Sequence, residues 1–438
     1  MYDLLPPAVY IHESVMADPR YRGRAERVVH ALTEPIRPVV YCDADLPDMI
    51  ADKGLLANRK PMGTLDEVRD PILLFNTFRF DGKREERLRS LKEKTPGLSD
   101  YMLTELLGYR AFHWARYNLK GDPDRRDKVC RPCWRIHLQN GCVHRCLYCT
   151  FGGLLVAMTN VEEYCEHLAE IIRRHPWQKT YLLDDDGDPP CLEPEHGCLG
   201  RLIEFFGTQR DRYLIIHTKT WNTEWMRDLA HNGNTIIVWS ISSEKQSTLI
   251  EPNTGSTEGR IEAARIAQEA GYTIRYKFKP IVPVVGWRDQ AARAVEMIFE
   301  RTQPDVISLC VFMWNTYDQL LERVDAELMD PACLEAARDA QDEVADTRTK
   351  PFPERIRAMI YDHYLAEIRK HDPDIPVSLS TESFSMWKAF AGKLGMTATN
   401  YVCGCGPQSV PNARKLTDHA FNVAVRDSEG IPGVVVGV

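Results

Sequence analysis

The sequence predicts an α/β protein: a partial (βα)6 TIM-type parallel barrel with a smaller N-terminal α/β domain and a C-terminal helical extension. Strand-like runs rich in β-branched residues alternate with helix-like stretches between residues 134 and 312, as in a series of βα units. Polar residues and cysteines gather where these runs end, which is where such barrels collect their ligands. The 438 residues, 44% of them hydrophobic, are enough for a barrel and a smaller domain.

The smaller domain is predicted over residues 1–125. Apolar runs there predict strands at 8–12 and 38–42, with a helix over 20–32 between them. Apolar residues at helical spacing predict another helix over 100–109, after a turn at 95–97. No residue pattern in this part indicates chemistry.

The barrel is predicted over residues 126–315. Its strands are expected at 135–139, 180–184, 213–218, 235–241, 273–282 and 306–312. Its helices are expected at 160–175, 198–206, 223–231, 257–270 and 290–301. Asn160 suits a helix N-cap, and Gly233 suits the position just after a helix. The extension, residues 316–438, adds helices at 356–370 and 384–394 and a seventh strand at 377–380.

Composition narrows the classes of partner. A formal net charge of −8 is unlike that of proteins held on DNA mainly by phosphate contacts, so a nucleic-acid partner ranks below a small molecule. No apolar run reaches membrane-spanning length, and the N-terminus has no basic segment before an apolar core. We therefore expect a cytoplasmic protein without a membrane partner. Its 13 cysteines then indicate metal or redox chemistry rather than disulfides.

Three cysteines, Cys142, Cys146 and Cys149, form a Cys-x3-Cys-x2-Cys array within one short loop. Thiolates are the ligands that iron–sulfur clusters select, and four of them normally saturate a [4Fe–4S] cluster. Three ligands would leave one iron open for chemistry. The alternatives are a zinc site, which would need a further Cys/His pair nearby, and a chance group of buried thiols.

An acidic run, residues 184–188, follows the second barrel strand. Crowded carboxylates raise one another's pKa, so Asp185 and Asp188 are candidates for binding an amine or sugar hydroxyls, or for a general base. A solvated acidic turn is the alternative. A hydrogen-atom donor would have to be a thiol, for which Cys191, Cys198 and Cys310 are candidates; Cys310 lies in the sixth strand, and an inert buried thiol is the alternative for each.

Two further cysteine pairs, Cys130/Cys133 and Cys403/Cys405, lie before the barrel and in the tail. The two pairs could together hold a second iron–sulfur cluster or a zinc ion. The alternative is two unrelated pairs of thiols.

The cysteine loop resembles the signature of the radical S-adenosylmethionine (SAM) enzymes. The resemblance implies that the open iron binds SAM, that reductive cleavage gives a 5′-deoxyadenosyl radical, and that Tyr148, just before the third cysteine, packs on the adenine. It also implies a reductant such as flavodoxin or ferredoxin.

The barrel more specifically resembles the spore photoproduct lyase family. The likeness runs through HTK (217–219), HNGNT (231–235), WSI (239–241), EPNT (251–254), RIEAA (260–264) and AGY (270–272), and VYIHE (9–13) resembles the family's N-terminal segment. It implies that Lys219 and Ser240 contact SAM. The family's hydrogen-donor cysteine and its partner tyrosine fall at Asp185 and Thr150, so both are missing here.

These departures, with the negative charge, lead to the prediction of a radical SAM enzyme acting on a small polar substrate such as a nucleoside or sugar. The alternatives are a spore photoproduct lyase-like DNA lesion repair enzyme, and a non-catalytic iron–sulfur or zinc protein.

Overall fold

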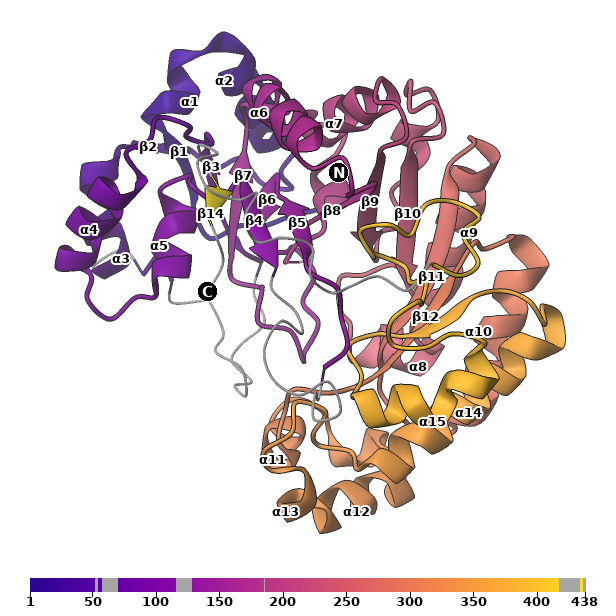
Figure 1. The fold of residues 1–438 in the computed structure, drawn as a ribbon. Helices are drawn as coiled ribbons and strands as arrows, with labels where there is room; N and C mark the ends of the chain where they lie inside the picture. Colours follow the sequence, from indigo (N-terminus) through magenta and orange to yellow (C-terminus); the bar gives the residue numbers. More distant parts are fainter. Residues whose placement is uncertain (52–53, 57–69, 116–127, 185, 417–433, 436–438) are drawn as a thin grey trace.

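The computed structural model describes residues 1–438 apart from 52–53, 57–69, 116–127, 185, 417–433 and 436–438. Two sheets organise the described chain (Figure 1). The larger has nine strands in the order β13-β12-β11-β10-β9-β8-β5-β4-β14, and the smaller has five in the order β2-β1-β3-β7-β6. The larger sheet is open at its edges, so the predicted partial barrel is confirmed.

Seven neighbouring strands of the larger sheet run parallel, as a series of βα units requires. Their inner and outer faces are both covered, which explains why their sequences are apolar throughout instead of alternating. They are β5 (Cys133–Ile136), β8 (Thr180–Leu183), β9 (Tyr213–Thr218), β10 (Thr235–Ser240), β11 (Thr273–Ile281), β12 (Ile307–Val311) and β13 (Val377–Leu379). Antiparallel to β5 lies β4 (Phe112–Ala115), and β4 pairs with β14 (Val434–Val435).

Amphipathic helices connect these strands and cover the outer face of the sheet (Figure 1). Four lie close to the predicted ranges: α6 (Val161–Arg174), α7 (Cys198–Gly207), α9 (Thr257–Glu269) and α10 (Trp287–Arg301). A short helix, α8 (Glu244–Leu249), follows β10. The extension contributes α11 (Tyr317–Leu321), α12 (Pro331–Asp339), α13 (Gln341–Val344), α14 (Glu354–His371) and α15 (Phe384–Leu394).

The smaller sheet contains β1 (Val9–His12), β2 (Val39–Tyr41), β3 (Ile72–Asn76), β6 (Gln139–Asn140) and β7 (Leu154–Met158). Around it lie α1 (Glu13–Ala17), α2 (Pro19–His30), α3 (Leu46–Ala51), α4 (Arg84–Lys94) and α5 (Asp100–Leu106). β3 and β7 were not predicted because each is apolar throughout, and neither shows the alternation of a half-buried strand. β6 and β7 flank the cysteine loop, so this loop leaves and re-enters the smaller sheet beside the barrel. The division at residue 125 stays a prediction.

One local prediction is wrong. Residues 223–231 form only a 3-10 turn (Glu224–Met226), and the Met226 carbonyl accepts both the Leu229 N–H at 3.3 Å and the Tyr272 hydroxyl at 2.9 Å. Asn160 is the N-cap residue of α6, as predicted, but its side chain makes no capping bond and instead bonds the backbone N–H and carbonyl of Phe78 at 2.7 and 2.9 Å. A tertiary partner thus takes the place of the local hydrogen bond that Asn160 favours.

The described part of the chain contains no helix both long and apolar enough to cross a bilayer.

Candidate active site

A cavity of about 390 Å³ opens where the parallel strands of the larger sheet end. The thiols of Cys142, Cys146 and Cys149 line it, as do Tyr148 and Lys219. Further lining comes from the ends of β8 to β12 and from the loop after β13, including Asp186, Asp188, Ser240, Lys277, Lys279, Phe312, Trp314 and Thr381. The structure therefore brings the predicted cysteine array, the SAM-contact candidates and part of the acidic run to one place.

The cysteine loop is folded so that backbone N–H groups point at its sulfurs. His144 N–H donates to Cys142 Sγ at 3.4 Å, and Phe151 N–H donates to Cys149 Sγ at 3.5 Å. A turn joins the second and third cysteines, with Cys149 N–H donating to the Cys146 carbonyl at 3.0 Å. Hydrogen bonds to sulfur stabilise negative charge there, which suits thiolates that bind a metal cluster.

Gly141 allows the chain to enter this loop. Its φ is +98°, and a Cβ there would lie 2.0 Å from the Leu154 carbonyl oxygen of the neighbouring strand. Only glycine satisfies both the positive φ and this close approach.

Replacing Gly141 by alanine is expected to lower the free energy of unfolding by at least about 2 kcal/mol and to reduce iron uptake, because the loop must shift away from Leu154. Gly152→Ala is the matched control, since a Cβ at Gly152 meets nothing within 4 Å. Iron content after anaerobic reconstitution and the thermal midpoint measure both effects. Equal iron uptake by the two variants would contradict the assigned role of Gly141.

The loop after α8 holds the cysteine loop through its backbone. Arg145 N–H donates to the Pro252 carbonyl at 3.0 Å, and Leu147 N–H donates to the Ile250 carbonyl at 2.9 Å. Asn253 adds a side-chain bond from Nδ2 to the Val143 carbonyl at 2.8 Å. The three cysteines are therefore positioned by a segment about a hundred residues further along the chain.

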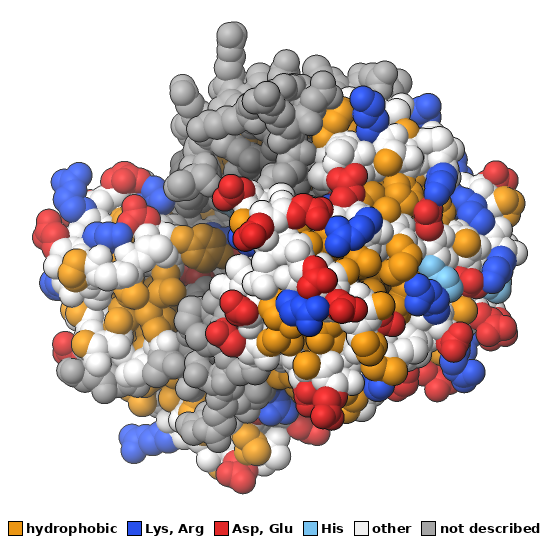
Figure 2. Space-filling model, turned by 90° about the horizontal axis from the view of Figure 1, so that it is seen from below, with side chains coloured by type: hydrophobic (Ala, Val, Ile, Leu, Met, Phe, Trp, Pro, Cys, Tyr) orange, Lys and Arg blue, Asp and Glu red, His pale blue; other side chains and the backbone are white. Residues whose placement is uncertain are grey.

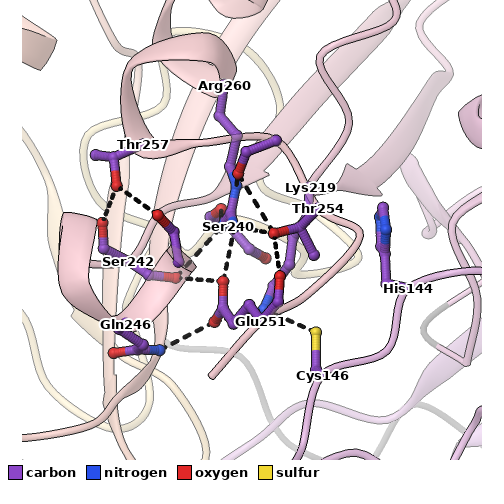
Figure 3. A network of polar contacts seen from close by, with 12 residues as sticks. His144, Cys146, Lys219, Ser240, Ser242, Gln246, Glu251, Thr254, Thr257 and Arg260 are labelled. Atoms are coloured by element: carbon purple, nitrogen blue, oxygen red, sulfur yellow. Dashed lines mark hydrogen bonds and ion pairs between the residues drawn. The ribbon is translucent and has the colours of Figure 1, made fainter. Parts of the chain in front are cut away.

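Glu251 is the centre of the polar network behind the loop (Figure 3). This carboxylate is fully buried and accepts from Lys219 Nζ at 2.8 Å and from Arg260 Nη2 at 2.7 Å. Tyr148 and Ser242 donate their hydroxyls to it at 2.6 and 2.7 Å. Burial alone would raise the pKa of Glu251, but the two cations hold it well below its usual range. Sequence reasoning missed Glu251, and the EPNT segment was its only signal.

The three residues predicted to contact SAM lie together on this network. Tyr148 Oη also contacts Lys219 Nζ, which lies 3.8 Å from Cys146 Sγ. Ser240 ends β10 at the cavity, and its carbonyl accepts from Arg260 Nη1 at 2.9 Å. Lys219 is thus held between a thiol and a carboxylate at the edge of the cysteine array (Figure 3).

The described aspartates of the acidic run, Asp184, Asp186 and Asp188, are buried and hydrogen-bonded within the protein, unlike those of a solvated turn. Asp184 accepts the backbone N–H of Leu138 at 3.0 Å, and burial raises its pKa well above the usual range. Asp186 accepts from Arg110 Nη2 at 2.6 Å and from the Tyr101 hydroxyl at 2.7 Å.

Asp188, a predicted catalytic residue, is also bonded internally. It accepts from the Thr218 hydroxyl at 2.7 Å and from Lys219 N–H at 2.7 Å, and bonds His144 Nε2 at 2.8 Å. His144, Asp188 and Cys191 place three ligand-type atoms within 4.8 Å of one another. Through these hydrogen bonds Asp188 links the cysteine loop to the start of the Lys219 segment, and its catalytic role stays a prediction. Asp185 lies outside the described residues.

Comparison with known proteins bears on the same region. A family model for spore photoproduct lyase matches residues 129–314, which include the cysteine loop and the Glu251 network. Over these residues the barrel is similar to the spore photoproduct lyase-like radical SAM proteins. Spore photoproduct lyase of Bacillus subtilis (strain 168) is 28% identical over 180 residues, covering 40% of this chain and 53% of that protein. The Clostridium acetobutylicum protein of the same name is 26% identical over 172 residues, covering 37% and 51%.

The chain thus spans about half the length of the curated relatives it matches. A solved spore photoproduct lyase complexed with dinucleoside spore photoproduct is similar over 86% of this chain and 99% of that chain, with a TM-score of 0.55 and 14% identity. Another, with bound AdoMet and dinucleoside spore photoproduct, has a TM-score of 0.54 at 14% identity. At these identities the likeness shows the fold.

The donor set of the cysteine loop fits a [4Fe–4S] cluster. Three thiols face one cavity, two of them accept backbone N–H bonds, and Lys219 supplies a positive charge beside Cys146. Three protein ligands leave one corner of such a cluster for SAM, and Tyr148, Lys219 and Ser240 line the space next to it.

Asp185, the residue expected at the hydrogen-donor position, lies outside the described residues. The equivalent of the partner tyrosine, Thr150, lines the cavity. Cys310, the thiol predicted as a donor, is fully buried in β12, with Sγ 3.6 Å from the Thr381 hydroxyl, which itself lines the cavity. Burial raises the pKa of Cys310. Its catalytic role stays a prediction.

Proposed function

We propose that this chain is a radical SAM enzyme that acts on a damaged dinucleotide in DNA. The observation that carries the proposal is the three-cysteine loop, buttressed by the Glu251 network inside a barrel that the spore photoproduct lyase model matches. When bound, the cluster and SAM supply a 5′-deoxyadenosyl radical that abstracts a hydrogen atom from the substrate. The chain's own residues hold the cysteine loop and orient Lys219.

The lining of the cavity supports a substrate with bases and a phosphate. Phe151, Phe312 and Trp314 are aromatic, and nucleobases stack on such side chains. Lys279 Nζ lies 4.9 Å from the centre of the Trp314 ring and is a positive charge suited to a phosphate. Burial lowers the pKa of the neighbouring Lys277, so an anion beside it would favour its charged form.

The predicted small polar substrate has less support than this alternative, because the family and the cavity lining both favour a nucleotide. The net charge of −8 is compatible with a nucleotide substrate, since a local cluster of cations can bind phosphate whatever the total charge of the protein. On the face in Figure 2, basic and acidic side chains are interspersed, so binding would depend on the cavity more than on that surface. The reductant, flavodoxin or ferredoxin, stays a prediction.

Release of 5′-deoxyadenosine by reduced, reconstituted protein tests the proposal. We expect dinucleoside spore photoproduct or lesion-bearing oligonucleotides to stimulate release, and undamaged thymidylyl-thymidine, nucleosides and sugars to leave it at the basal rate. Lys279→Ala should raise the substrate concentration needed about tenfold while leaving basal release unchanged, because it removes one charged contact. Stimulation by a nucleoside or sugar, and by no lesion, would contradict the proposal.

A further inference from the structure

The C-terminal tail returns to the inside of the larger sheet and brings Cys403 and Cys405 with it (Figure 1). Cys405 packs against Leu182, Ile215, Ile236 and Val238, side chains of β8, β9 and β10 that form a small core inside the sheet. This part of the tail is therefore an integral part of the barrel interior.

Buried hydrogen bonds hold this segment in place. The fully buried Arg275 of β11 donates from Nη2 to the Ser409 carbonyl at 2.8 Å, and Gly404 N–H donates to the Ser308 hydroxyl at 3.1 Å. On the other side, the Pro407 carbonyl accepts the N–H groups of Lys179 and Thr180 at 2.8 and 3.1 Å. Such extensive anchoring fixes the positions of both tail cysteines.

The segment that carries the other cysteine pair, Cys130 and Cys133, packs against this tail. Arg131, between Cys130 and Cys133, donates to the Thr399 carbonyl at 3.0 Å and lies over the Tyr401 ring at 4.5 Å. These contacts join two segments that lie about 270 residues apart in the sequence.

The four thiols are close enough to influence one another's ionisation. Cys403 interacts directly with Cys405, and electrostatic interactions link Cys130 to Cys403 and Cys133 to both Cys130 and Cys405. None of the four forms a disulfide, so no disulfide accounts for the grouping. The cations Arg135 and Lys277 lie next to the group, beside Cys133 and Cys405, where they would balance negative charge.

The spacing of the thiols distinguishes between the two kinds of metal site. Around a single zinc ion, thiolate sulfurs lie roughly 4 Å apart, whereas a cubane holds its ligands further apart. Among the described residues, no three of these four sulfurs lie within 4.8 Å of one another, and the same is true of the three sulfurs in the Cys142–Cys149 loop. The four thiols therefore do not match the close grouping of ligands around a single zinc ion.

We propose that Cys130, Cys133, Cys403 and Cys405 bind a second [4Fe–4S] cluster. Cys130 and Cys405 line the same cavity as the three-cysteine loop, so this cluster would face the SAM site across the substrate space. With four protein thiolates it has no open iron, and SAM does not bind to it. The proposal is independent of the substrate named above.

Iron counting in two complementary variants tests the proposal. Reconstituted protein should hold about eight iron atoms per chain, and a variant with Cys142, Cys146 and Cys149 all replaced by alanine should keep about four. Cys403→Ser/Cys405→Ser should also keep about four and should still cleave SAM. Cys165→Ser, a thiol on α6 outside both groups, is the control and should keep about eight.

A spectroscopic readout separates the two clusters. The electron paramagnetic resonance signal of the reduced triple-alanine variant should be unchanged by SAM, because a cluster with four thiolates has no site for it. Stoichiometric zinc in place of iron in that variant, or the complete loss of iron from it with the fold intact by circular dichroism, would overturn the proposal. This result does not depend on the tail variant folding, because the triple-alanine variant leaves all four proposed ligands in place.

Discussion

Cys146→Ser is expected to reduce SAM cleavage by at least about 100-fold, since even the outer-shell partners of a metal ligand change affinity or activity by 10–100-fold. Cys146 is the thiol nearest Lys219, and its loss leaves two thiolates on the loop, too few to hold three corners of a cubane. The release of 5′-deoxyadenosine from anaerobically reconstituted protein, normalised to protein, is the measurement.

Cys333→Ser is a suitable control for this change. Cys333 is a buried thiol on α12, away from both groups of cysteines, and should leave SAM cleavage close to that of the unmodified protein. If Cys146→Ser and Cys333→Ser cleaved SAM equally well, the assignment of the cluster ligands would be wrong. Circular dichroism of the two apo-proteins checks that any difference comes from the cluster.

Glu251→Gln is expected to destabilise the protein by about 3–5 kcal/mol, the usual cost of removing one partner from a buried ion pair. The carboxylate compensates both Lys219 and Arg260, and the neutral amide would leave two buried or nearly buried cations without a counter-charge. Glu251 lies in the loop whose backbone bonds the cysteine loop, so we also expect weaker SAM binding. The denaturation midpoint of the apo-protein and SAM binding to the reconstituted protein measure the two effects.

Glu262→Gln is the matched control, because it makes the same chemical change on the same stretch of chain. Its partner Arg265 is 34% exposed and Glu262 is 41% exposed, so loss of this surface pair should cost less than about 1 kcal/mol. Equal losses of stability in the two variants would show that the buried network does not support the site as described.

The local features of the site could be predicted from the sequence. Cys142, Cys146 and Cys149 lie within eight residues, so their spacing alone indicates a cluster loop whatever the rest of the chain does. The seven parallel strands of the larger sheet were also predictable, because β-branched runs alternate with amphipathic helices, but β4 and β14 of the same sheet were not predicted. The SAM contacts of Tyr148, Lys219 and Ser240 could be predicted only through the family resemblance. The structure places all three residues on one cavity.

The roles of charged residues could not be predicted, because they depend on partners that are distant in sequence. Asp188 was predicted to be catalytic from its place in an acidic run, and the fold adds what the run does not show: Thr218, the Lys219 N–H and His144 are its hydrogen-bond partners. No role was predicted for Glu251, which appeared only as part of the EPNT segment, although its carboxylate pairs with both Lys219 and Arg260 behind the cysteine loop. Burial and pairing decide what a carboxylate does, and neither is a local property of the sequence.

By itself, the sequence determined the type of fold and the spacing of the three cysteines that are predicted to bind the cluster, because closely spaced thiols and hydrophobic periodicity are local patterns. Only the tertiary structure decided that Glu251 supports the cysteine loop, that Asp188 is held by hydrogen bonds, and that Cys130 and Cys133 meet Cys403 and Cys405. Such meetings depend on how the strands pack and where the tail re-enters the barrel. The physical reason is that the burial of a side chain, and its pairing with residues distant in sequence, depend on the arrangement of the complete fold.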